Sequence, residues 1–495
     1  MNKTTKRSEE RRVGKECTSL FTPYRFGELG VTFGEPLTQP TSAFPPGDPA
    51  AQALLESNAA NLLKLDDRGE FGNSNAPWAP DPSTPLRAGD TLPAGATGPL
   101  AFSFGEYKIQ PIGEFPTTVP ASERPLAPTL EDGNDIAAFN VLNYFTTFGS
   151  RGAANQAEFD LQAAKIVAAI NELDAKVLGL IELENNYDGD VPAIVDLVER
   201  LNADAGEATW DFVGLPGGGN IGPDEIAVGI IYQPAEATLI GDGATFDIDA
   251  LLTGEDLDNN RWPLAATFEI DAERFTVVVN HLKSKGSECT DTAATGYFEL
   301  GEDVGSDLLG NCDLTRQYAV DQLLQWLDTD PTGSNDSDVF IVGDLNAYDD
   351  EAPITALEAA GYVDVIERDA DDASTFKFDG RYGRLDYLMA SQTAATLVTD
   401  AAVWQANSPE FVGYLYDNEP IDTVETATPY ASSDHDPVVL SLRDKVVNEP
   451  KNIWACFRGG WKSLTDDEGN EFRNARQCLR YVLIRDFGWG WKKRW

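Results

Sequence analysis

The sequence has no long apolar run: nowhere do about 18 apolar residues follow one another, the length that a transmembrane helix needs. The first residues, MNKTTKRSEERRVGKECTSL, begin with basic side chains but have no apolar stretch behind them, so no signal peptide is visible. We therefore expect no membrane span. Two alternatives stay open at the N-terminus, a cytoplasmic protein or a chain that lacks its natural start.

Positively charged residues are scarce. The chain has 37 Lys and Arg against 82 Asp and Glu, a net charge of −45. Residues 1–17 carry +3 and residues 451–495 carry +5, which leaves −53 on the segment between them. Such acidity keeps a protein hydrated at high ionic strength, so the composition predicts a saline surrounding. It also repels polyanions, and any nucleic-acid partner would have to be bound through local cations.

Cysteine is rare as well, with five in the chain. Cys289 and Cys312 enclose a polar, glycine-rich stretch, GSECTDTAATGYFELGEDVGSDLLGNC, that has no apolar periodicity. A cross-link would order such a loop and is worth roughly 3 kcal/mol in the chain-entropy model. We expect a disulfide and an oxidising compartment; the alternative is two unrelated thiols.

Composition and residue patterns divide the chain into four parts. Residues 1–17 form a basic extension, native or foreign, and residues 18–130 are rich in Pro and Gly with short strand patterns such as PLAFSFGEYKIQPI, which predicts a small β domain. Strands and helices alternate over residues 135–445, the pattern of an α/β domain. The tail, residues 450–495, is basic and rich in tryptophan, and its role is open: an appendage that binds cell wall or nucleic acid, or foreign sequence.

Polar side chains gather where the apolar strand patterns end. VLGLIELENN ends in Glu182 and Glu184, FTVVVNHLKSKGS in His281 and Lys283, and DVFIVGDLNAYDDEAP in Asp344 and Asn346, while SSDHDPVVLSL begins with Asp434, His435 and Asp436 and IAAFNVLNYF contains Asn140. Ligands of α/β sheets bind at strand ends, so this placement predicts a site. We expect Glu182 to face it and Glu184 to be solvated. Asp436 is expected to cap a turn, and Asp349, Asp350 and Glu351 to form a solvated loop.

These residue types suit one chemistry. Carboxylate and amide oxygens prefer Mg²⁺, Mn²⁺ or Ca²⁺, whereas a zinc site would use several His or Cys. The only two histidines of the chain, His281 and His435, can serve as general base and general acid, each oriented by a carboxylate such as Asp386 or Asp224. Lys283 and Arg261 supply positive charge. A hard metal, paired imidazoles and cations together predict hydrolysis of a phosphate ester.

The ordered set FNVLNYF, IELENN, NRWPL, NHLKSKGS, GDLNAYDDEAP, GRLDY and SSDHDPVVL resembles the endonuclease/exonuclease/phosphatase (DNase I-like) superfamily, and within it large secreted bacterial extracellular nucleases. The resemblance covers residues 135–442 and implies a four-layer α/β/β/α sandwich of two packed mixed sheets. Residues 18–130 resemble the OB-like β region that precedes the catalytic domain in that group, in incomplete form. The absent signal peptide implies a truncated chain.

The resemblance also implies roles for single residues. Asn140, Glu182 and Asp434 would hold a catalytic Mg²⁺ or Mn²⁺, with Ca²⁺ as a further ion. The catalytic set would be His281, His435, Asp386, Asp344 and Asn346; the substrate phosphate would meet Arg261, Lys283 and Arg316; and Asp224 or Glu225 would orient the second imidazole. The implied protein is secreted, has a Cys289–Cys312 disulfide and cleaves DNA, or RNA. Its oligomeric state is open from the sequence, with a monomer expected. Two rival hypotheses are the same fold acting on a sphingomyelin- or inositol-type phosphate ester, and a non-catalytic surface module that binds Ca²⁺ or DNA.

Overall fold

The computed structural model describes residues 10–12, 17–20, 28–34, 36–68, 87–92, 95–103, 105–114, 123–149, 151–250, 260–286, 288–289, 308–370, 373–416, 428–443, 450–457, 459–464 and 472–487. Over these residues no helix is both long and apolar enough to cross a membrane.

One central sheet has six strands in the order β10 (Asp211–Phe212), β11 (Ile226–Tyr232), β9 (Val177–Glu184), β8 (Ile136–Tyr144), β21 (Val438–Leu442) and β20 (Val398–Val403). β8 and β9 run parallel and the other neighbours antiparallel. A second sheet also has six strands, in the order β12 (Thr238–Thr245), β13 (Leu264–Ile270), β14 (Glu273–His281), β15 (Val339–Asp344), β19 (Asp386–Ala390) and β16 (Val363–Asp364). Here β14 and β15 form the parallel pair. Both sheets are therefore mixed.

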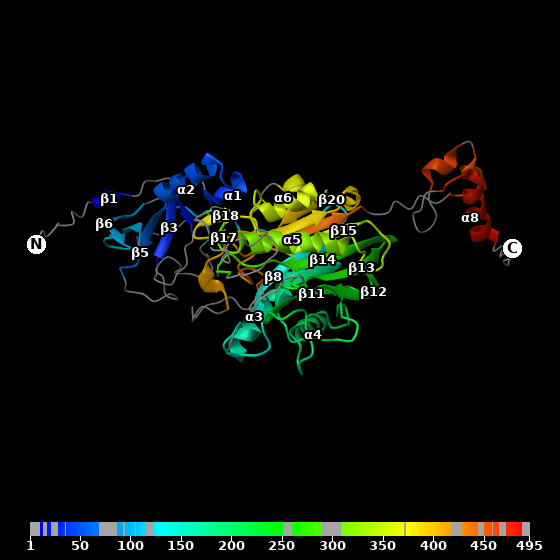
Figure 1. The fold of residues 1–495 in the computed structure, drawn as a ribbon, viewed down its shortest axis with the longest axis horizontal. Helices are drawn as coiled ribbons and strands as arrows, with labels where there is room; N and C mark the ends of the chain where they lie inside the picture. The colour runs from blue at the N-terminus through cyan, green and yellow to red at the C-terminus, as the bar shows by residue number, and fades with distance from the viewer. Residues whose placement is uncertain are drawn as a thin grey trace, which may run out of the picture.

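The two sheets pack face to face and helices cover their outer faces (Figure 1). Strand side chains such as Val279 and Val342 fill the space between the sheets so tightly that a Cβ added at Gly179 would lie 2.8 Å from a Val279 methyl. α3 (Gln156–Leu173) and α4 (Ala193–Ala205) cover the first sheet. α5 (Asp313–Leu327) and α6 (Ala352–Ala359) cover the second. The predicted four-layer sandwich is confirmed.

Shorter elements complete this domain. α7 (Val365–Asp369) follows β16, and three-residue 3₁₀ turns form η1 (Ala394–Thr396) and η2 (Val412–Tyr414). A small sheet joins β17 (Phe376–Phe378) and β18 (Arg381–Gly383) to β4 (Leu37–Thr38), which comes from the N-terminal part of the chain. α1 (Pro40–Ala43) follows β4 directly, and Figure 1 shows it beside β17 and β18.

The N-terminal part also has a sheet of its own. Its strand order is β1 (Glu10–Arg12), β6 (Thr97–Ser103), β7 (Glu106–Ile109), β5 (Leu63–Asp66), β3 (Glu28–Phe33) and β2 (Cys17–Leu20). The β content was predicted, whereas α1 and α2 (Pro49–Asn61) were not. α2 begins where the Asp48 side chain accepts from the Ala50 N–H at 2.8 Å and Pro49 takes the first helical position. The OB-like identity of this part stays a prediction.

The tail forms a small unit from η3 (Ile453–Cys456), η4 (Gly460–Ser463) and α8 (Ala475–Phe487). A disulfide joins Cys456 to Cys478, and both cysteines are buried together with Phe472 and Val482.

Candidate active site

The polar strand ends meet in one cavity of about 370 Å³ between the rims of the two central sheets. Glu182 reaches it from β9, His281 from β14, Asp344 from β15 and His435 from the turn before β21. The sheet register aligns them, since His281 pairs with Asp344 and Asp344 pairs with Asp386 across neighbouring strands. The sequence prediction that these strand ends converge is therefore confirmed in space.

Gly343 makes this register possible. Its φ is +119°, and a Cβ there would lie 2.3 Å from the Asn280 carbonyl oxygen. Only glycine has no Cβ to clash, so it lets β15 approach β14 closely just before Asp344.

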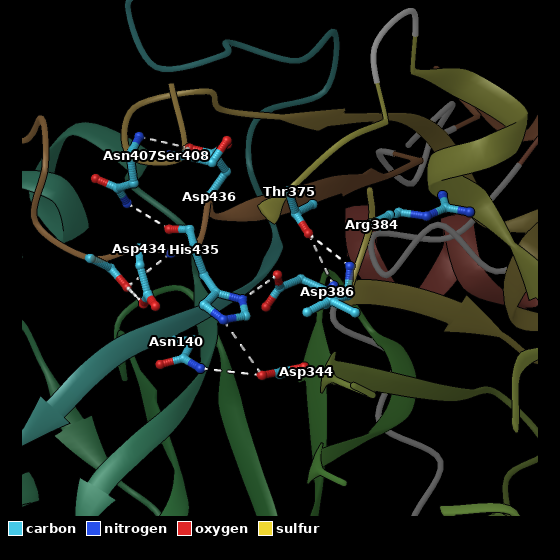
Figure 2. A network of polar contacts seen from close by, with 12 residues as sticks. Asn140, Asp344, Thr375, Arg384, Asp386, Asn407, Ser408, Asp434, His435 and Asp436 are labelled. Carbon is cyan, nitrogen blue, oxygen red and sulfur yellow. Dashed lines mark hydrogen bonds and ion pairs between the residues drawn. The ribbon is translucent and has the colours of Figure 1, made fainter. Parts of the chain in front are cut away.

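His435 is held in place by Asp386. Its Nδ1 lies 2.8 Å from Asp386 Oδ2, and its Nε2 lies 3.8 Å from Asp344 Oδ2 (Figure 2). Thr375 Oγ1 accepts the Asp386 backbone N–H at 3.1 Å, and the Phe376 ring stacks on the imidazole at a centroid distance of 4.5 Å. Burial by itself lowers the pKa of His435, but the Asp386 and Asp344 carboxylates outweigh it and hold that pKa well above its usual value.

His281 has the opposite electrostatic environment. Its Nε2 lies 3.5 Å from Asp344 Oδ2, while burial and the neighbouring Arg261 lower its pKa well below the usual value. Asp224 and Glu225 were the two residues predicted to orient the His281 ring, and neither does so. Asp224 Oδ2 instead accepts from Arg261 Nε at 2.9 Å, and the Glu225 side chain is exposed. Within the described residues His281 Nδ1 is buried without a hydrogen-bond partner, so this part of the prediction is corrected.

Asp344 lies between the two imidazoles and is itself fixed by amides. Asn140 Nδ2 donates to its Oδ2 at 3.3 Å (Figure 2), and the Asn346 backbone N–H donates to its Oδ1 at 2.9 Å. Burial raises the pKa of Asp344 to about 7, although His435 opposes this. Asn346 adopts a left-handed φ of +47° and donates its side-chain amide to the Leu282 carbonyl at 3.1 Å. Two imidazoles and a carboxylate that titrates near neutrality can exchange protons here.

Glu182 faces the cavity because β9 is irregular at that point. The β9–β11 register shifts between residues 227 and 229, and Glu182 has a φ of +69°. Such a bulge redirects a side chain. Burial and the Asp434 carboxylate raise the pKa of Glu182, which accepts the Asn143 N–H at 3.0 Å. Two carboxylates that repel each other in a buried place are a donor set that a divalent cation would stabilise.

Two groups of side chains could hold that cation. Asn140, Glu182 and Asp434 are the predicted ligands; Asn140 Oδ1 also accepts the Leu142 N–H at 3.0 Å. Among the described residues, Asp344, Asp386 and His435 form the other group, with ligand atoms within 4.8 Å of one another. In the second group His435 Nδ1 and Asp386 are bonded to each other, whereas the first group offers only oxygen ligands, which a hard metal prefers.

Positive charge reaches the cavity from Arg261, Arg151, Lys285 and Arg381. Arg261 is buried, bonded to Asp224 and to the Leu282 carbonyl at 3.0 Å. The nearby Lys283 contributes to the lowered pKa of His281. The sequence patterns did not mark Arg151 and Lys285 as site residues, because neither directly ends an apolar strand.

Arg316 does not face the cavity, and its predicted role is corrected. Its side chain is fully buried and donates to the carbonyls of Lys283 (3.0 Å), Asn311 (2.7 Å) and Leu309 (3.3 Å). It therefore fixes the two stretches that the Cys289–Cys312 disulfide joins. That disulfide is present, as predicted.

Three acidic residues near the site have structural partners. Glu184, expected to be solvated, is buried and accepts the backbone N–H groups of Thr146 (2.8 Å) and Thr147 (3.1 Å). Glu351, placed by the sequence in a solvated loop, is also buried and binds Thr41 at 2.8 Å and Lys285. Asp436 was expected to cap the turn before Pro437, and this is corrected: its side chain instead accepts the N–H groups of residues 407 and 408, a distant segment, at 2.7 and 3.0 Å (Figure 2).

Comparison with known proteins finds similar solved structures. No family model matches the chain, and no curated protein sequence matches it. An endonuclease/exonuclease/phosphatase family protein from Bacteroides thetaiotaomicron is 16% identical with a TM-score of 0.39, over 62% of this chain and 96% of that chain. A mannosyl-6-phosphatase of the same organism and a humanized D. rerio TDP2 give the same identity, TM-score and coverage of this chain, each over 98% of its own length.

Proposed function

We propose that this chain is a secreted, divalent-metal-dependent phosphodiesterase that hydrolyses DNA. The observation that carries the proposal is the meeting of two buried histidines around one carboxylate: His281 and His435 lie 3.5 and 3.8 Å from the same oxygen of Asp344. A structural histidine needs no second imidazole opposite it. A reaction that takes a proton from one atom and returns a proton to another does.

The cation would be held by Asn140, Glu182 and Asp434, of which Glu182 lines the cavity. When bound, a divalent ion polarises the phosphate and stabilises the charge that develops on it. Glu182 supports this assignment, because burial and Asp434 together disfavour its charged form when no cation is near.

The protein side chains would then handle the protons. A water oxygen bonds to phosphorus as the bond from phosphorus to the leaving oxygen breaks; one imidazole takes the water proton and the other gives a proton to the leaving oxygen. Asp386 fixes the ring of His435 through Nδ1 and leaves Nε2 directed at Asp344 (Figure 2).

The remaining groups would bind the phosphate. Arg261 and Arg151 line the cavity as cations, and Asn346 lines it next to Asp344. Arg261 is held by Asp224, so its guanidinium is fixed before substrate arrives. In this arrangement one side of a DNA phosphodiester would face the metal, and its other side would face the arginine side chains.

Secretion is proposed from the cysteines. Cys289–Cys312 and Cys456–Cys478 are both disulfides, and such bonds persist mainly in oxidising compartments.

The function is tested with His281→Ala, His435→Ala and Asp344→Ala. Each should lower the kcat for plasmid DNA by about 10² to 10⁴, the usual contribution of a general acid or base. Glu199→Ala, an exposed position on α4, is the matched control and should cleave like the parent protein. Cleavage should stop with EDTA and return with Mg²⁺ or Mn²⁺.

A substrate panel separates the rival activities. DNA, RNA, sphingomyelin, an inositol phosphate and bis-p-nitrophenyl phosphate are assayed with the same preparation. Full activity in all three alanine variants would overturn the site assignment, and preference for a lipid or sugar phosphate would overturn the substrate.

A further inference from the structure

Besides its polar groups, the catalytic cavity is lined by aromatic residues. These are Tyr348, Phe376 and Phe378, and Leu385 and Gln39 line the cavity with them. Phe376 stacks against His435, which places this lining directly beside the atoms that would act on the phosphate. The group of a substrate that adjoins its reacting phosphate would therefore meet an aromatic surface.

Gln39 belongs to the N-terminal part of the chain, far from the other lining residues in sequence. Backbone pairing carries it there: β4 adds to β18 with Leu37 opposite Arg381 and Thr38 opposite Tyr382. The Gln39 N–H then donates to the Tyr382 carbonyl at 2.8 Å. The residue is thus held by main-chain bonds, as a strand residue of the catalytic domain would be.

The turn after Gln39 is anchored as firmly. Thr41 Oγ1 donates to Glu351 at 2.8 Å and the Thr41 carbonyl accepts the Asp350 N–H at 3.0 Å, while Glu351 also binds Lys285, whose ammonium lies over the Tyr348 ring at 5.0 Å. Gly383 allows the close approach, because a Cβ there would lie 2.9 Å from Ser42 Oγ and 2.5 Å from the Tyr348 ring. The N-terminal segment is therefore part of the cavity wall.

Two of these side chains have capacity to bind a ligand. The Phe378 side chain is 58% exposed although it lines the cavity, an unusual place for a large apolar ring. The Gln39 side chain is buried, and its amide makes a long hydrogen bond of 3.4 Å to the Phe378 carbonyl among the contacts of the described residues. An exposed ring beside a weakly engaged amide suits a flat group that has hydrogen-bonding edges.

We propose that Gln39, Phe376 and Phe378 form a base-binding subsite, in which the nucleobase next to the scissile phosphate stacks on Phe378 while the Gln39 amide hydrogen-bonds its edge. The subsite rests on the proposed phosphodiesterase function and gives it a substrate class, a nucleotide unit rather than a bare phosphate ester. Stacking of bases on aromatic side chains tolerates any sequence, and amides pair well with base edges. The N-terminal part of the chain thereby supplies specificity to a catalytic site built elsewhere.

The test compares thymidylyl-thymidine with the two analogues in which a tetrahydrofuran replaces one base. The parent protein should cleave one of these analogues about 10 to 100 times less efficiently in kcat/KM, the usual effect of losing one stacked base. Phe378→Ala and Gln39→Ala should lower kcat/KM for the intact dinucleotide but leave that analogue unaffected. Phe102→Ala is the matched control: this ring is also 52% exposed but lies on β6, in the separate N-terminal sheet.

A binding measurement keeps the two proposals apart. Calorimetry compares thymidine 5′-monophosphate with deoxyribose 5-phosphate, and Phe378→Ala should bind both equally while the parent prefers the nucleotide. Cleavage of all dinucleotides at equal rates, or equal losses on intact and abasic substrates in the variants, would overturn the subsite. A preference for the nucleotide without any cleavage would instead overturn the phosphodiesterase function and leave the subsite standing.

Discussion

Removal of the Cys289–Cys312 disulfide should weaken both the stability and the substrate affinity of the catalytic domain. The bridge joins residues separated by 23 positions, and the chain-entropy model assigns a loop of that length about 3.4 kcal/mol. The free energy of unfolding of the Cys289→Ser/Cys312→Ser variant should fall by roughly that amount.

The same change should raise KM more than it lowers kcat. Lys285, just before the bridged loop, and Gly310, within it, line the cavity, and Lys285 Nζ donates to the Leu309 carbonyl at 2.8 Å. The histidines, by contrast, lie at strand ends that do not depend on the loop. Weaker positioning of this wall therefore affects binding first.

The assay is a urea titration followed by circular dichroism, with kcat and KM measured on a chromogenic phosphodiester. Cys456→Ser/Cys478→Ser is a control of almost the same loop length, with a separation of 22, but it lies in the C-terminal unit. It should leave KM unchanged. An unaltered unfolding free energy and KM in the first variant would refute the reasoning, because Arg316 and Lys285 would then hold the loop without the cross-link.

Three further predictions concern charge. Burial lowers the pKa of Lys285 to about 8, so its ammonium is charged below pH 8 and neutral above; KM for an anionic substrate should rise as the pH passes from 7 to 9, and Lys285→Gln should lack this rise. Cleavage of DNA should persist or increase between about 0.1 and 1 M NaCl, because the screening length shortens from about 10 to 3 Å and the body of the protein is strongly acidic; a steep fall would contradict the saline hypothesis. Glu184→Ala should lower the free energy of unfolding by about 1 to 3 kcal/mol in a urea titration, because two part-buried N–H groups lose a charged acceptor, whereas Glu199→Ala should change it by less than about 0.5 kcal/mol.

The side chains at the strand ends could be predicted from the sequence. Strand periodicity is visible in short segments, and the strand ends of an α/β sheet are where ligands bind. Glu182, His281, Asp344 and His435 all followed from such patterns and do line one cavity. The division of roles between Glu182 and Glu184 followed only in part. A strand period of two places both on one face, and the bulge with its φ of +69° at Glu182 is what separates them.

Contacts between distant segments could not be predicted in this way. Arg316 lies in the first turn of α5 and was predicted to bind phosphate. Its guanidinium instead donates hydrogen bonds to backbone carbonyls on the two stretches that the disulfide joins. Glu351 looked solvated, yet its partner Thr41 lies 310 positions away. No local pattern marks either contact, because each depends on where another segment packs.

The charge distribution favours binding of the substrate part that lies in the cavity over binding of parts farther along a nucleic acid. The chain as a whole carries −45, while Arg151, Arg261 and Lys285 line the cavity itself. A long nucleic acid would be attracted at the cavity and repelled by the acidic remainder of the protein, so additional phosphates would contribute little to affinity. Affinity must then come from the groups nearest the reacting phosphate. An aromatic wall that binds the adjoining base would supply such affinity without added positive charge, and its stacking contacts would not be screened by salt.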